Sequence, residues 1–449
     1  MGKLSAARAC ACKLLAEQRV RGARARDLLR TSPDVAALDA RDRGLCTRLV
    51  LGVVATRGAL DACLDARVTK LRPRVRDALR VGAYELLYAD VSPHVAVSQG
   101  VELAAYADRG ARGMANAVLR RLEREELPLL RQLRERASSG ACSADELACA
   151  FGLPAWLVAC VADGRGLAEA HAFARASLTA APVWVRANEL RDDAARVPEL
   201  LRAQGLDPRP EENEPQVWRL EHAAGLAASG LVDDGTLVVA DLAAQRVARL
   251  ASPAPGSWLL EVGQGRGTKT LLLQMQAHAA GGLAHVVGVD SVAFKTKLAA
   301  ERVARDCGPF VRCVTFDARK LGGADLPAAL CRPFDQVFVD APCSGTGTLR
   351  RHPEIAWDLD PQAVQAAAPG SLVELQASIL AGSAARVAPG GLLSYATCSV
   401  LPAEDEDVVD AFLSSTAGKA FERCAPDWRS APAPGGCDGH YLARLRRVG

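Results

Sequence analysis

The sequence predicts two architectures in one chain, an all-α helical bundle at the N-terminus and a C-terminal α/β domain with a doubly wound, mostly parallel sheet. Two patterns support this fold class: apolar residues at helical spacing early in the chain, and short apolar runs alternating with helix-like segments after Val238. A chain of 449 residues is longer than a single hydrophobic core usually organises, so more than one domain is expected. We therefore predict a helical domain over residues 1–136, a connecting subdomain over 137–235 and the α/β domain over 236–449.

The N-terminal part has the periodicity of packed helices. Apolar residues recur three or four positions apart across residues 4–133, as in Leu45 and Leu49. Ser-Pro pairs at 32–33 and 92–93 interrupt the pattern and mark turns between helices. This spacing predicts a helical bundle.

The middle of the chain has a mixed pattern. The sequence predicts a helix near Pro154–Ala159, a strand at Pro182–Asn188 and a loop at Asp207–Pro210. We interpret residues 137–235 as a subdomain that connects the two larger parts.

Strands and helices alternate after Val238. Short apolar runs bounded by Gly and Pro predict strands, with helix-like segments at 293–306 and 372–387 between them. The predicted strands are Ser257–Val262, His285–Asp290, Phe310–Phe316, Phe334–Asp340 and Gly391–Thr397. This alternation is typical of a doubly wound, mostly parallel sheet.

Charge is distributed unevenly along the chain. The formal net charge is only +3, yet residues 1–136 contain 26 Lys and Arg against 16 Asp and Glu, which leaves 29 against 36 for the remainder. The first part is therefore +10 and the rest is −7. A basic module favours binding of a polyanion such as nucleic acid, while a solvated arginine-rich surface explains the same charge equally well.

Cysteine usage and the N-terminus indicate the compartment. The 14 cysteines lack metal-ligand spacing, and Cys10 and Cys12 are one residue too close for a Cys-x-x-Cys pair, so we expect no metal and a reducing environment. The first residues begin a helical pattern without an apolar leader, and no apolar stretch is long enough to span a bilayer. We predict a cytoplasmic protein without membrane association, and no obligate protein partner is evident.

A glycine-rich loop follows the first strand of the α/β domain. Gly263–Thr270 reads Gly-Gln-Gly-Arg-Gly-Thr-Lys-Thr and opens into a helix. Glycines let the backbone approach a ligand closely, and a helix N-terminus offers N–H groups to an anion. A plain strand-to-helix turn is the alternative for this loop taken alone.

Three acids close three strands, and one lysine lies in the loop. Asp290 can accept hydrogen bonds from the ribose of an adenosine cofactor, and Asp317 can lie near the adenine. Asp340 closes a further strand, and Lys269 can pair with a cofactor carboxylate. Each aspartate alone is equally compatible with helix capping, so the prediction depends on their combination.

Two cysteines lie just beyond predicted strands. Cys343 occurs in Asp-Ala-Pro-Cys-Ser-Gly after the strand that ends at Asp340, and Cys398 occurs in Ala-Thr-Cys-Ser after the strand that ends at Thr397. Ligands of α/β sheets bind at the carboxyl ends of the strands, so a thiol there can attack a bound group. A buried apolar cysteine is the structural alternative for each.

These blocks resemble a known family. Residues 340–347 with Arg350–Glu354, and then Thr397–Pro402, resemble the signature blocks of the RsmB/NOP family of RNA 5-methylcytosine methyltransferases. The N-terminal segments are similar to the NusB-like RNA-binding domain of the RsmB/Sun (Fmu) branch. They are Leu45–Gly52, Tyr84–Tyr88, Pro93–Gln99 and Asn116–Arg121.

The resemblance implies a class I, Rossmann-like methyltransferase domain that uses S-adenosylmethionine. The glycine-rich loop departs from the family pattern Asp-x-Cys-Ala-Ala-Pro-Gly-Gly-Lys-Thr and keeps only Gly267, Lys269 and Thr270, with Glu261 preserving the acid. We expect cofactor binding to survive this change. The implied cofactor-binding residues are Gly263, Gln264, Gly265, Arg266, Gly267, Thr268, Lys269, Asp290, Asp317 and Asp340.

The resemblance also implies roles in catalysis and in RNA binding. Cys398 would attack C6 of a cytosine, Cys343 would assist release of the product, and Asp340 would bind the cytosine edge. Arg350, Arg351 and His352 would contact RNA phosphates, with a structural ion pair as the alternative. Asp241–Gln245 resembles a family segment near the substrate pocket, while capping of a helix by Asp241 explains it equally well.

The expected activity is therefore transfer of a methyl group to C5 of a cytosine in small-subunit (16S) rRNA. A tRNA cytosine-C5 methyltransferase is an alternative with the same chemistry. A non-catalytic, NusB-like RNA-binding factor whose altered loop has lost the cofactor is an alternative of a different class.

Overall fold

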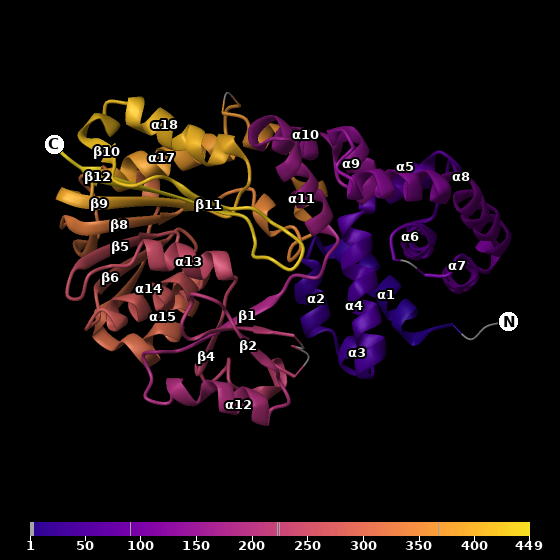
Figure 1. Ribbon diagram of the computed structural model, residues 1–449, viewed down its shortest axis with the longest axis horizontal. Coiled ribbons are helices and arrows are strands. Elements are labelled where there is room, and N and C mark those ends of the chain that lie inside the picture. Colours follow the sequence, from indigo (N-terminus) through magenta and orange to yellow (C-terminus); the bar gives the residue numbers. More distant parts are fainter. Residues whose placement is uncertain (1–3, 90, 222, 224, 367) are drawn as a thin grey trace. The chain divides into compact units, whose positions relative to one another are not determined.

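The computed structural model describes residues 4–89, 91–221, 223, 225–366 and 368–449, and these fall into two compact units (Figure 1). The first unit comprises the described residues up to Ala180 together with Thr348–Leu359. The second comprises Ala181–Gly347 and the described part of Asp360–Gly449. The chain therefore leaves the second unit and returns to it within the C-terminal half.

The first unit is helical, as predicted. Its helices are α1 (Ala6–Arg21), α2 (Ala25–Thr31), α3 (Pro33–Ala36), α4 (Ala40–Ala55), α5 (Arg57–Asp65), α6 (Pro73–Leu87), α7 (Pro93–Ala107), α8 (Arg112–Ser138), α9 (Ala144–Phe151), α10 (Ala155–Arg165), α11 (Leu167–Ser177) and the short α16 (Ile355–Asp358). The Ser-Pro pairs mark helix starts, because Pro33 and Pro93 open α3 and α7 and proline is tolerated in a first turn. Gly22 ends α1 in the left-handed conformation.

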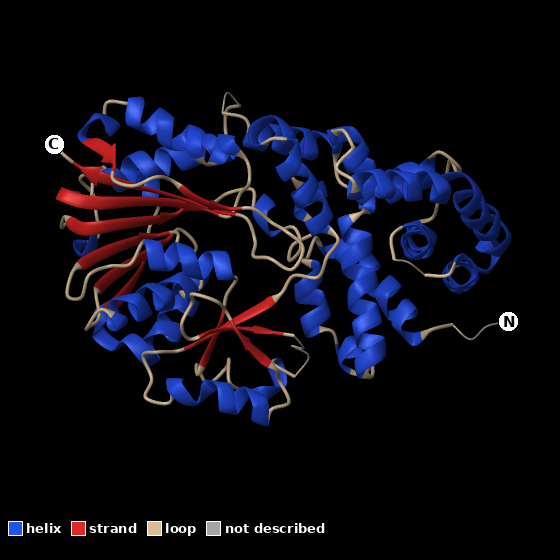
Figure 2. Cartoon of the chain, in the orientation of Figure 1, coloured by secondary structure: helices blue, strands red, loops and turns tan. Residues whose placement is uncertain are grey.

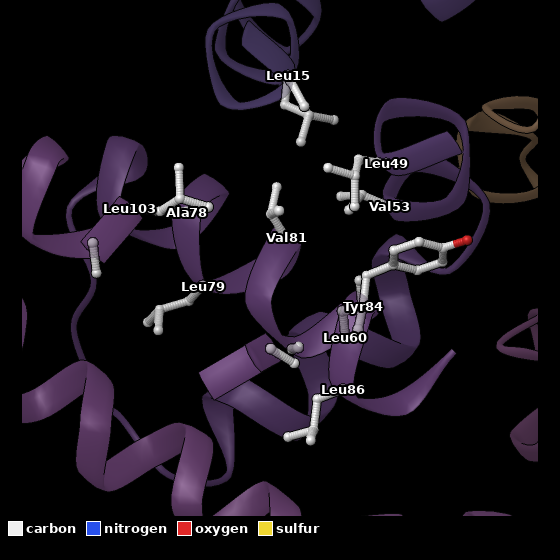
Figure 3. Packing of buried hydrophobic residues seen from close by; sticks show 14 of the residues in the cluster. Leu15, Leu49, Val53, Leu60, Ala78, Leu79, Val81, Tyr84, Leu86 and Leu103 are labelled. Carbon is white, nitrogen blue, oxygen red and sulfur yellow. The ribbon is translucent and has the colours of Figure 1, made fainter. Parts of the chain in front are cut away.

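The core of the first unit is formed by α1, α4, α6 and α7. Leu15, Leu49 and Val81 are almost fully buried and turn toward one another (Figure 3). Along α4, Leu49 and Val53 lie four residues apart and are both buried, in agreement with the helical periodicity of the sequence. The residues that predicted a bundle are therefore the residues that pack it.

The second unit contains two sheets (Figure 2). The smaller sheet has the strand order β2-β3-β1-β4, and each strand runs antiparallel to its neighbour. Its strands are β1 (Val183–Ala187), β2 (Pro208–Pro210), β3 (Val217–Leu220) and β4 (Leu237–Val239), with α12 (Val197–Ala203) beside them. The predicted loop at Asp207–Pro210 is wrong, because β2 pairs with β3 there. Proline is tolerated in such an edge strand.

The larger sheet has the order β10-β12-β9-β8-β5-β6-β7, with β11 beside β12. Its strands are β5 (Trp258–Val262), β6 (His285–Asp290), β7 (Val311–Thr315), β8 (Phe334–Asp340), β9 (Val387–Thr397), β10 (Phe421–Arg423), β11 (Trp428–Ser430) and β12 (His440–Arg447). Strands β7, β6, β5, β8 and β9 are parallel neighbours, whereas β12 runs antiparallel to β9. The predicted doubly wound, mostly parallel sheet is confirmed, and the three C-terminal strands extend it.

Helices cover both faces of this sheet (Figure 1). They are α13 (Leu242–Leu250), α14 (Thr268–Ala279) and α15 (Ala293–Cys307) on one face, and α17 (Leu372–Ala384) and α18 (Glu406–Ser414) on the other. Neighbouring residues of β5 alternate between the two cores, since Leu259 belongs to one and Leu260 to the other. The winding reverses between β5 and β8, which places the ligand-binding crevice at their carboxyl ends.

The middle of the chain is divided between the two units. Helices α9, α10 and α11 belong to the first unit, and strands β1 to β4 belong to the second. The three-part division with its own connecting subdomain at 137–235 stays a prediction. Within the described residues, no helix combines the length and apolar character that a bilayer crossing requires.

Candidate active site

The two cysteines singled out in the sequence lie side by side. Strands β8 and β9 are parallel neighbours with Asp340 paired to Ala396, so the loops that follow them start at the same edge of the sheet. The Sγ atoms of Cys343 and Cys398 are 3.3 Å apart, and the Cys398 backbone N–H donates to Cys343 Sγ at 3.3 Å. Residues that are far apart in sequence thus form one dithiol site.

The environment of the pair gives the two thiols different proton affinities. A hydrogen bond from the Cys343 thiol lowers the pKa of Cys398, and the positive charge of Lys269 lowers it further, against the opposing effect of burial. The same hydrogen bond, reinforced by burial, raises the pKa of Cys343 well above its ordinary value. This arrangement favours Cys398 as the thiolate and Cys343 as the thiol that donates to it.

Lys269 and Asp340 form an ion pair beside the dithiol. Lys269 lies in the first turn of α14, and its Nζ is 2.7 Å from Asp340 Oδ2 at the end of β8. Burial by itself lowers the pKa of Lys269, but the charge of Asp340 and its hydrogen bond outweigh burial and raise the pKa overall. Lys269 therefore stays protonated and supplies positive charge next to Cys398.

A buried glutamate that the sequence analysis missed holds both cysteine loops together. The carboxylate of Glu404 accepts hydrogen bonds from the Ser344 backbone N–H at 2.7 Å, the Ser399 hydroxyl at 2.6 Å and the Gln376 amide at 3.0 Å. The Ser344 hydroxyl donates to it as well. Ser344 follows Cys343 and Ser399 follows Cys398, so Glu404 connects the residues next to both thiols.

The position of Glu404 explains why sequence reasoning did not find it. It ends a short 3₁₀ turn just before α18, among further acidic residues. Acidic residues are common near helix N-termini because they compensate the helix dipole. The one available signal is its place soon after the Thr397–Pro402 block.

The glycine-rich loop adopts the conformation that its glycines permit. Gly263, Gly265 and Gly267 have φ values of 80°, 59° and 78°. A Cβ at Gly263 would collide with the carbonyl oxygen of Asp340, so the loop lies directly against the end of β8. Glycine at this position allows the glycine-rich loop and the Asp340 block to meet at the switch point of the sheet.

Asp290 holds this loop from the end of β6. Its Oδ2 accepts from the Gly265 backbone N–H at 3.0 Å, and its Oδ1 accepts from the Val292 N–H at 2.9 Å. Arg266 is exposed, and the Thr268 hydroxyl accepts from Arg302 Nη1 at 2.7 Å. Backbone approach at glycines with an acid after the next strand fits the ribose and the charged end of an adenosine cofactor.

The side chain of Gln264 is turned inward, beneath the loop. Its Nε2 donates to Thr270 Oγ1 at 3.1 Å, and the Thr270 hydroxyl donates to Glu261 Oε2 at 2.6 Å. Gly288 of β6 leaves room for this side chain, because a Cβ there would overlap the Gln264 amide. Burial raises the pKa of Glu261 to about 8, against the opposing hydrogen bond from Thr270.

Asp317 lies just after β7 and has local partners. It caps the turn that follows by accepting from the Arg319 backbone N–H at 3.1 Å, and it pairs with the Arg319 guanidinium at 2.7 Å. Cofactor contacts of Asp317, Gln264, Arg266 and Thr268 stay predictions. Among the residues that the structure describes, no group of His, Cys, Asp and Glu side chains is arranged to hold a metal ion.

The candidate RNA-contacting residues belong to the first unit, which includes Thr348–Leu359. The side chain of Arg350 is buried with its residue 5% exposed, and Arg351 and His352 are partly buried. Their RNA contacts stay predictions. Asp241 caps α13 through the Ala243 N–H at 2.9 Å and also accepts from the Asp438 N–H at 3.0 Å.

Comparisons with known proteins agree with this fold. Residues 248–441 match the family described as 16S rRNA methyltransferase RsmB/F, and residues 5–124 match the NusB family. Proteins named ribosomal RNA small subunit methyltransferase B from Salmonella newport and Salmonella arizonae are each 31% identical to the chain over 416 residues, which cover 90% of both sequences.

Two solved structures have the same fold. The crystal structure of PH0851 aligns with a TM-score of 0.77 at 20% identity over 100% of both chains. NSun6 from Pyrococcus horikoshii, solved with SFG, aligns with a TM-score of 0.54 at 16% identity over 66% of this chain and 98% of its own.

Fold and site together define an S-adenosylmethionine-dependent methyltransferase joined to a NusB-family domain. The extent of the sequence match narrows this class. The chain belongs to the RsmB/F family of 16S rRNA methyltransferases.

Proposed function

We propose that this protein methylates C5 of a cytosine in small-subunit (16S) rRNA through a transient covalent bond between Cys398 and C6 of the base. The observation that carries this proposal is the 3.3 Å separation of the Cys343 and Cys398 sulfur atoms beside the Lys269–Asp340 pair. Membership of the RsmB/F family supports rRNA as the substrate.

The chemistry needs a nucleophilic thiolate. C5 of cytosine is a weak nucleophile, and addition of the Cys398 thiolate to C6 breaks the C5–C6 double bond and moves its electrons to C5, which becomes the nucleophilic carbon of an enamine. The lowered pKa of Cys398 and the charge of Lys269 support a thiolate at this position. Asp340 would accept hydrogen bonds from the cytosine edge and favour a proton on N3, so that negative charge does not accumulate on the ring.

Bound S-adenosylmethionine would supply the electrophilic methyl group, held by the glycine-rich loop and by Asp290. The loop backbone would receive the charged end of the cofactor, and Asp290 would accept hydrogen bonds from its ribose. Both contacts are predictions supported by the φ values of the loop and the position of Asp290.

Release of the product restores the aromatic ring. The C5 proton passes to a base, the electrons of the C–H bond re-form the C5–C6 double bond, and Cys398 leaves C6 as a thiolate. Cys343 would be this base or would assist it. Once Cys398 is bonded to carbon, the Cys398 thiolate no longer accepts the hydrogen bond that raises the pKa of Cys343.

The target cytosine must be presented outside a base stack, because C6 is inaccessible within a helix. The basic first unit would bind flanking rRNA through phosphate contacts, consistent with its NusB-family match. All 14 cysteines are free, which supports the reducing cytoplasm as the proposed location.

Cysteine variants test the two roles. Cys398→Ala should abolish both 5-methylcytosine and any covalent RNA adduct, whereas Cys343→Ala should trap the adduct as a band of reduced mobility on a denaturing gel. Cys331→Ala, an exposed thiol outside the site, is the matched control and should behave as wild type. Full activity of Cys398→Ala would show that the nucleophile is assigned wrongly.

The alternatives predict different outcomes in two measurements. Bisulfite mapping of RNA from a deletion strain should show loss of one modified cytosine in 16S rRNA, whereas a tRNA enzyme would lose a position in tRNA. Calorimetry with S-adenosylmethionine should show binding, whereas a non-catalytic RNA-binding factor would show none.

A further inference from the structure

The two thiols of the candidate active site are arranged like the two halves of a disulfide that has not formed. A disulfide joins sulfur atoms about 2.05 Å apart, so the Sγ atoms of Cys343 and Cys398, now 3.3 Å apart, need to approach by little more than about 1 Å. The Cys398 backbone N–H already donates to Cys343 Sγ at 3.3 Å, so one sulfur lies beside the main chain of the other cysteine. The bond can therefore form by rotation of the side chains, while the strand pairing stays as it is.

Other residues hold the main chain on which both cysteines lie. Strands β8 and β9 are paired up to Asp340 and Ala396, just before the two cysteine loops. The Glu404 carboxylate accepts hydrogen bonds from Ser344 and Ser399, the residues that follow the two cysteines. None of these contacts uses a cysteine sulfur. Since the loops are already ordered, closing the bond costs little conformational entropy.

The two thiols differ in the way that a reaction with peroxide requires. The thiolate is the attacking species, and the hydrogen bond from Cys343 and the charge of Lys269 lower the pKa of Cys398. Cys343, whose pKa is raised, keeps its proton and lies beside the sulfur that reacts. Both cysteines are partly exposed, so an oxidant as small as a hydroperoxide has access to them.

A second thiol pair, in the helical unit, lacks these properties. Cys10 on α1 and Cys46 on α4 share a hydrogen bond, but both are buried, with 8% and 0% of the residue exposed. Burial raises the pKa of both thiols, that of Cys46 to about 12. Buried thiols of this kind are inert. Proximity alone therefore does not make a thiol pair reactive, whereas partial exposure and the charge beside Cys398 do.

We propose that Cys398 and Cys343 form a reversible disulfide when the protein is exposed to a hydroperoxide, and that this disulfide stops methyl transfer. The disulfide itself depends on no assumption about the RNA substrate. The loss of methyl transfer rests on the proposed function, because the disulfide removes the thiolate that would add to C6. A dithiol reductant restores both thiols and the activity with them.

The bond forms in two steps with hydrogen peroxide as the oxidant. The Cys398 thiolate attacks one peroxide oxygen, the O–O bond breaks, and the displaced hydroxide takes a proton and leaves as water. Cys398, now a sulfenic acid, no longer accepts the hydrogen bond that raises the pKa of Cys343, so Cys343 can lose its proton.

The second step joins the two sulfur atoms. The Cys343 thiolate attacks the Cys398 sulfur, the S–O bond breaks, and the displaced hydroxide takes the proton that Cys343 lost and leaves as a second water. In sum, two thiols lose two electrons, and one peroxide is reduced to two waters.

The cofactor loop should be unaffected by this chemistry. Asp290 holds the loop through the Gly265 N–H, and Gln264 lies beneath it with a hydrogen bond to Thr270. These contacts involve neither cysteine. The oxidised protein should therefore stay folded and bind S-adenosylhomocysteine within about twofold of the reduced protein.

The test uses the purified protein as the whole chain. After exposure to a small excess of hydrogen peroxide and blocking of free thiols with iodoacetamide, peptide mapping by mass spectrometry should find the Cys343 and Cys398 peptides cross-linked. Dithiothreitol should remove this cross-link. Methyl transfer to 16S rRNA should fall at least about tenfold when cross-linking is complete. It should recover to within about twofold of the untreated protein after dithiothreitol.

Two variants sharpen this test. In Cys343→Ala the disulfide cannot form, so the same peroxide should carry Cys398 on to the sulfinic acid, which dithiothreitol does not reverse. Cys331→Ala, which removes an exposed thiol outside the site, is the matched control and should show the wild-type cross-link and recovery. The oxidation state is read by mass, so the altered turnover of Cys343→Ala does not affect this measurement.

Each contrary outcome has a definite meaning. Loss of activity without the Cys343–Cys398 cross-link, or a loss that dithiothreitol does not reverse, overturns the disulfide. A complete cross-link with undiminished methyl transfer overturns the loss of activity and, with it, the role of Cys398 as nucleophile. If the untreated protein makes no 5-methylcytosine, the proposed function fails, while the cross-link measured by mass still decides whether the disulfide forms.

Discussion

Two regions lie at the carboxyl edge of the parallel strands, the pair of cysteine loops and the glycine-rich loop, and each is next to a buried glutamate. Beneath the cysteine loops, Glu404 accepts hydrogen bonds at both carboxylate oxygens from Ser344, Ser399 and Gln376. Beneath the glycine-rich loop, Glu261 accepts only the Thr270 hydroxyl, and its Oε1 has no hydrogen-bond partner among the described residues.

This difference indicates that different interactions hold the cysteine loops and the glycine-rich loop in place. A carboxylate surrounded by donors is rigid, because every oxygen is satisfied in one geometry. A buried carboxyl with one partner is costly when charged, and the pKa of Glu261 accordingly rises to about 8. The cysteine loops are therefore fixed by hydrogen bonding, whereas the cofactor loop depends on packing and on a protonated acid.

Glu404→Gln should have the largest effect. The carboxamide has a single acceptor oxygen, so buried donors at Ser344 or Ser399 lose their partner, which costs about 1–3 kcal/mol of unfolding free energy for each group left unsatisfied. The two thiols should separate, and turnover should fall about 100-fold. Chemical denaturation and single-turnover methylation measure the two effects.

The control for this variant is Glu301→Gln, an exposed glutamate on α15 with 60% of its side chain accessible. It should leave stability and turnover unchanged. Wild-type turnover in Glu404→Gln would show that the carboxylate does not hold the cysteine loops in register.

Gly288→Ala should have an intermediate effect on the glycine-rich loop. The added Cβ would overlap the Gln264 amide and push that side chain from its place beneath the loop. We expect affinity for S-adenosylhomocysteine to fall about tenfold, equivalent to about 1.4 kcal/mol. Isothermal titration calorimetry measures it directly.

A double variant that combines Gly288→Ala with Gln264→Ala tests whether the two residues act through the same contact. With the Gln264 amide removed, Gly288→Ala should cost little more, because the two residues share one contact. An undiminished cost of Gly288→Ala in the Gln264→Ala background would contradict this route and point to β6 itself.

The smallest expected effect is the change of folding stability with pH that comes from Glu261. The pKa of Glu261 is about 8 in the fold against a usual value of 4.5, so the folded state binds one more proton between these values. The contribution of Glu261 to stability is then fully present below about pH 4.5 and is lost as the pH rises through about 8. Melting temperatures recorded from about pH 5 to pH 9 should show this decline.

Glu261→Gln should flatten that decline, because the amide does not titrate. Glu301→Gln again serves as the exposed control and should keep the wild-type slope. An identical slope in Glu261→Gln and wild type would exclude Glu261 as the titrating group.

Much of the fold could be predicted because local periodicity reports burial. The five parallel strands and the N-terminal helices follow from apolar spacing that any window of the sequence displays. The strands that were not predicted are β2, β3, β4, β10, β11 and β12, which depend on pairing with other strands more than on their own pattern.

The sequence predicted which residues lie in the candidate site, but not which side chains from other parts of the chain hydrogen-bond to them. Cys343, Cys398, Asp340 and Lys269 were found through motifs at strand ends. The role of Glu404 and the inward turn of Gln264 depend on neighbours that fold from other parts of the chain. A motif names residues at fixed spacing, but it does not report which distant donors surround them.

By itself the sequence determined the class of both parts and the strand ends where the two cysteines lie. These follow from local patterns, since periodicity and turn residues act over a few positions. Only the tertiary structure decided that the sulfur atoms of Cys343 and Cys398 lie 3.3 Å apart. It also decided that Thr348–Leu359 belongs to the first unit, where the Trp357 indole N–H donates to the Ala55 carbonyl. Such contacts join residues hundreds of positions apart, and strand register and side-chain packing decide them.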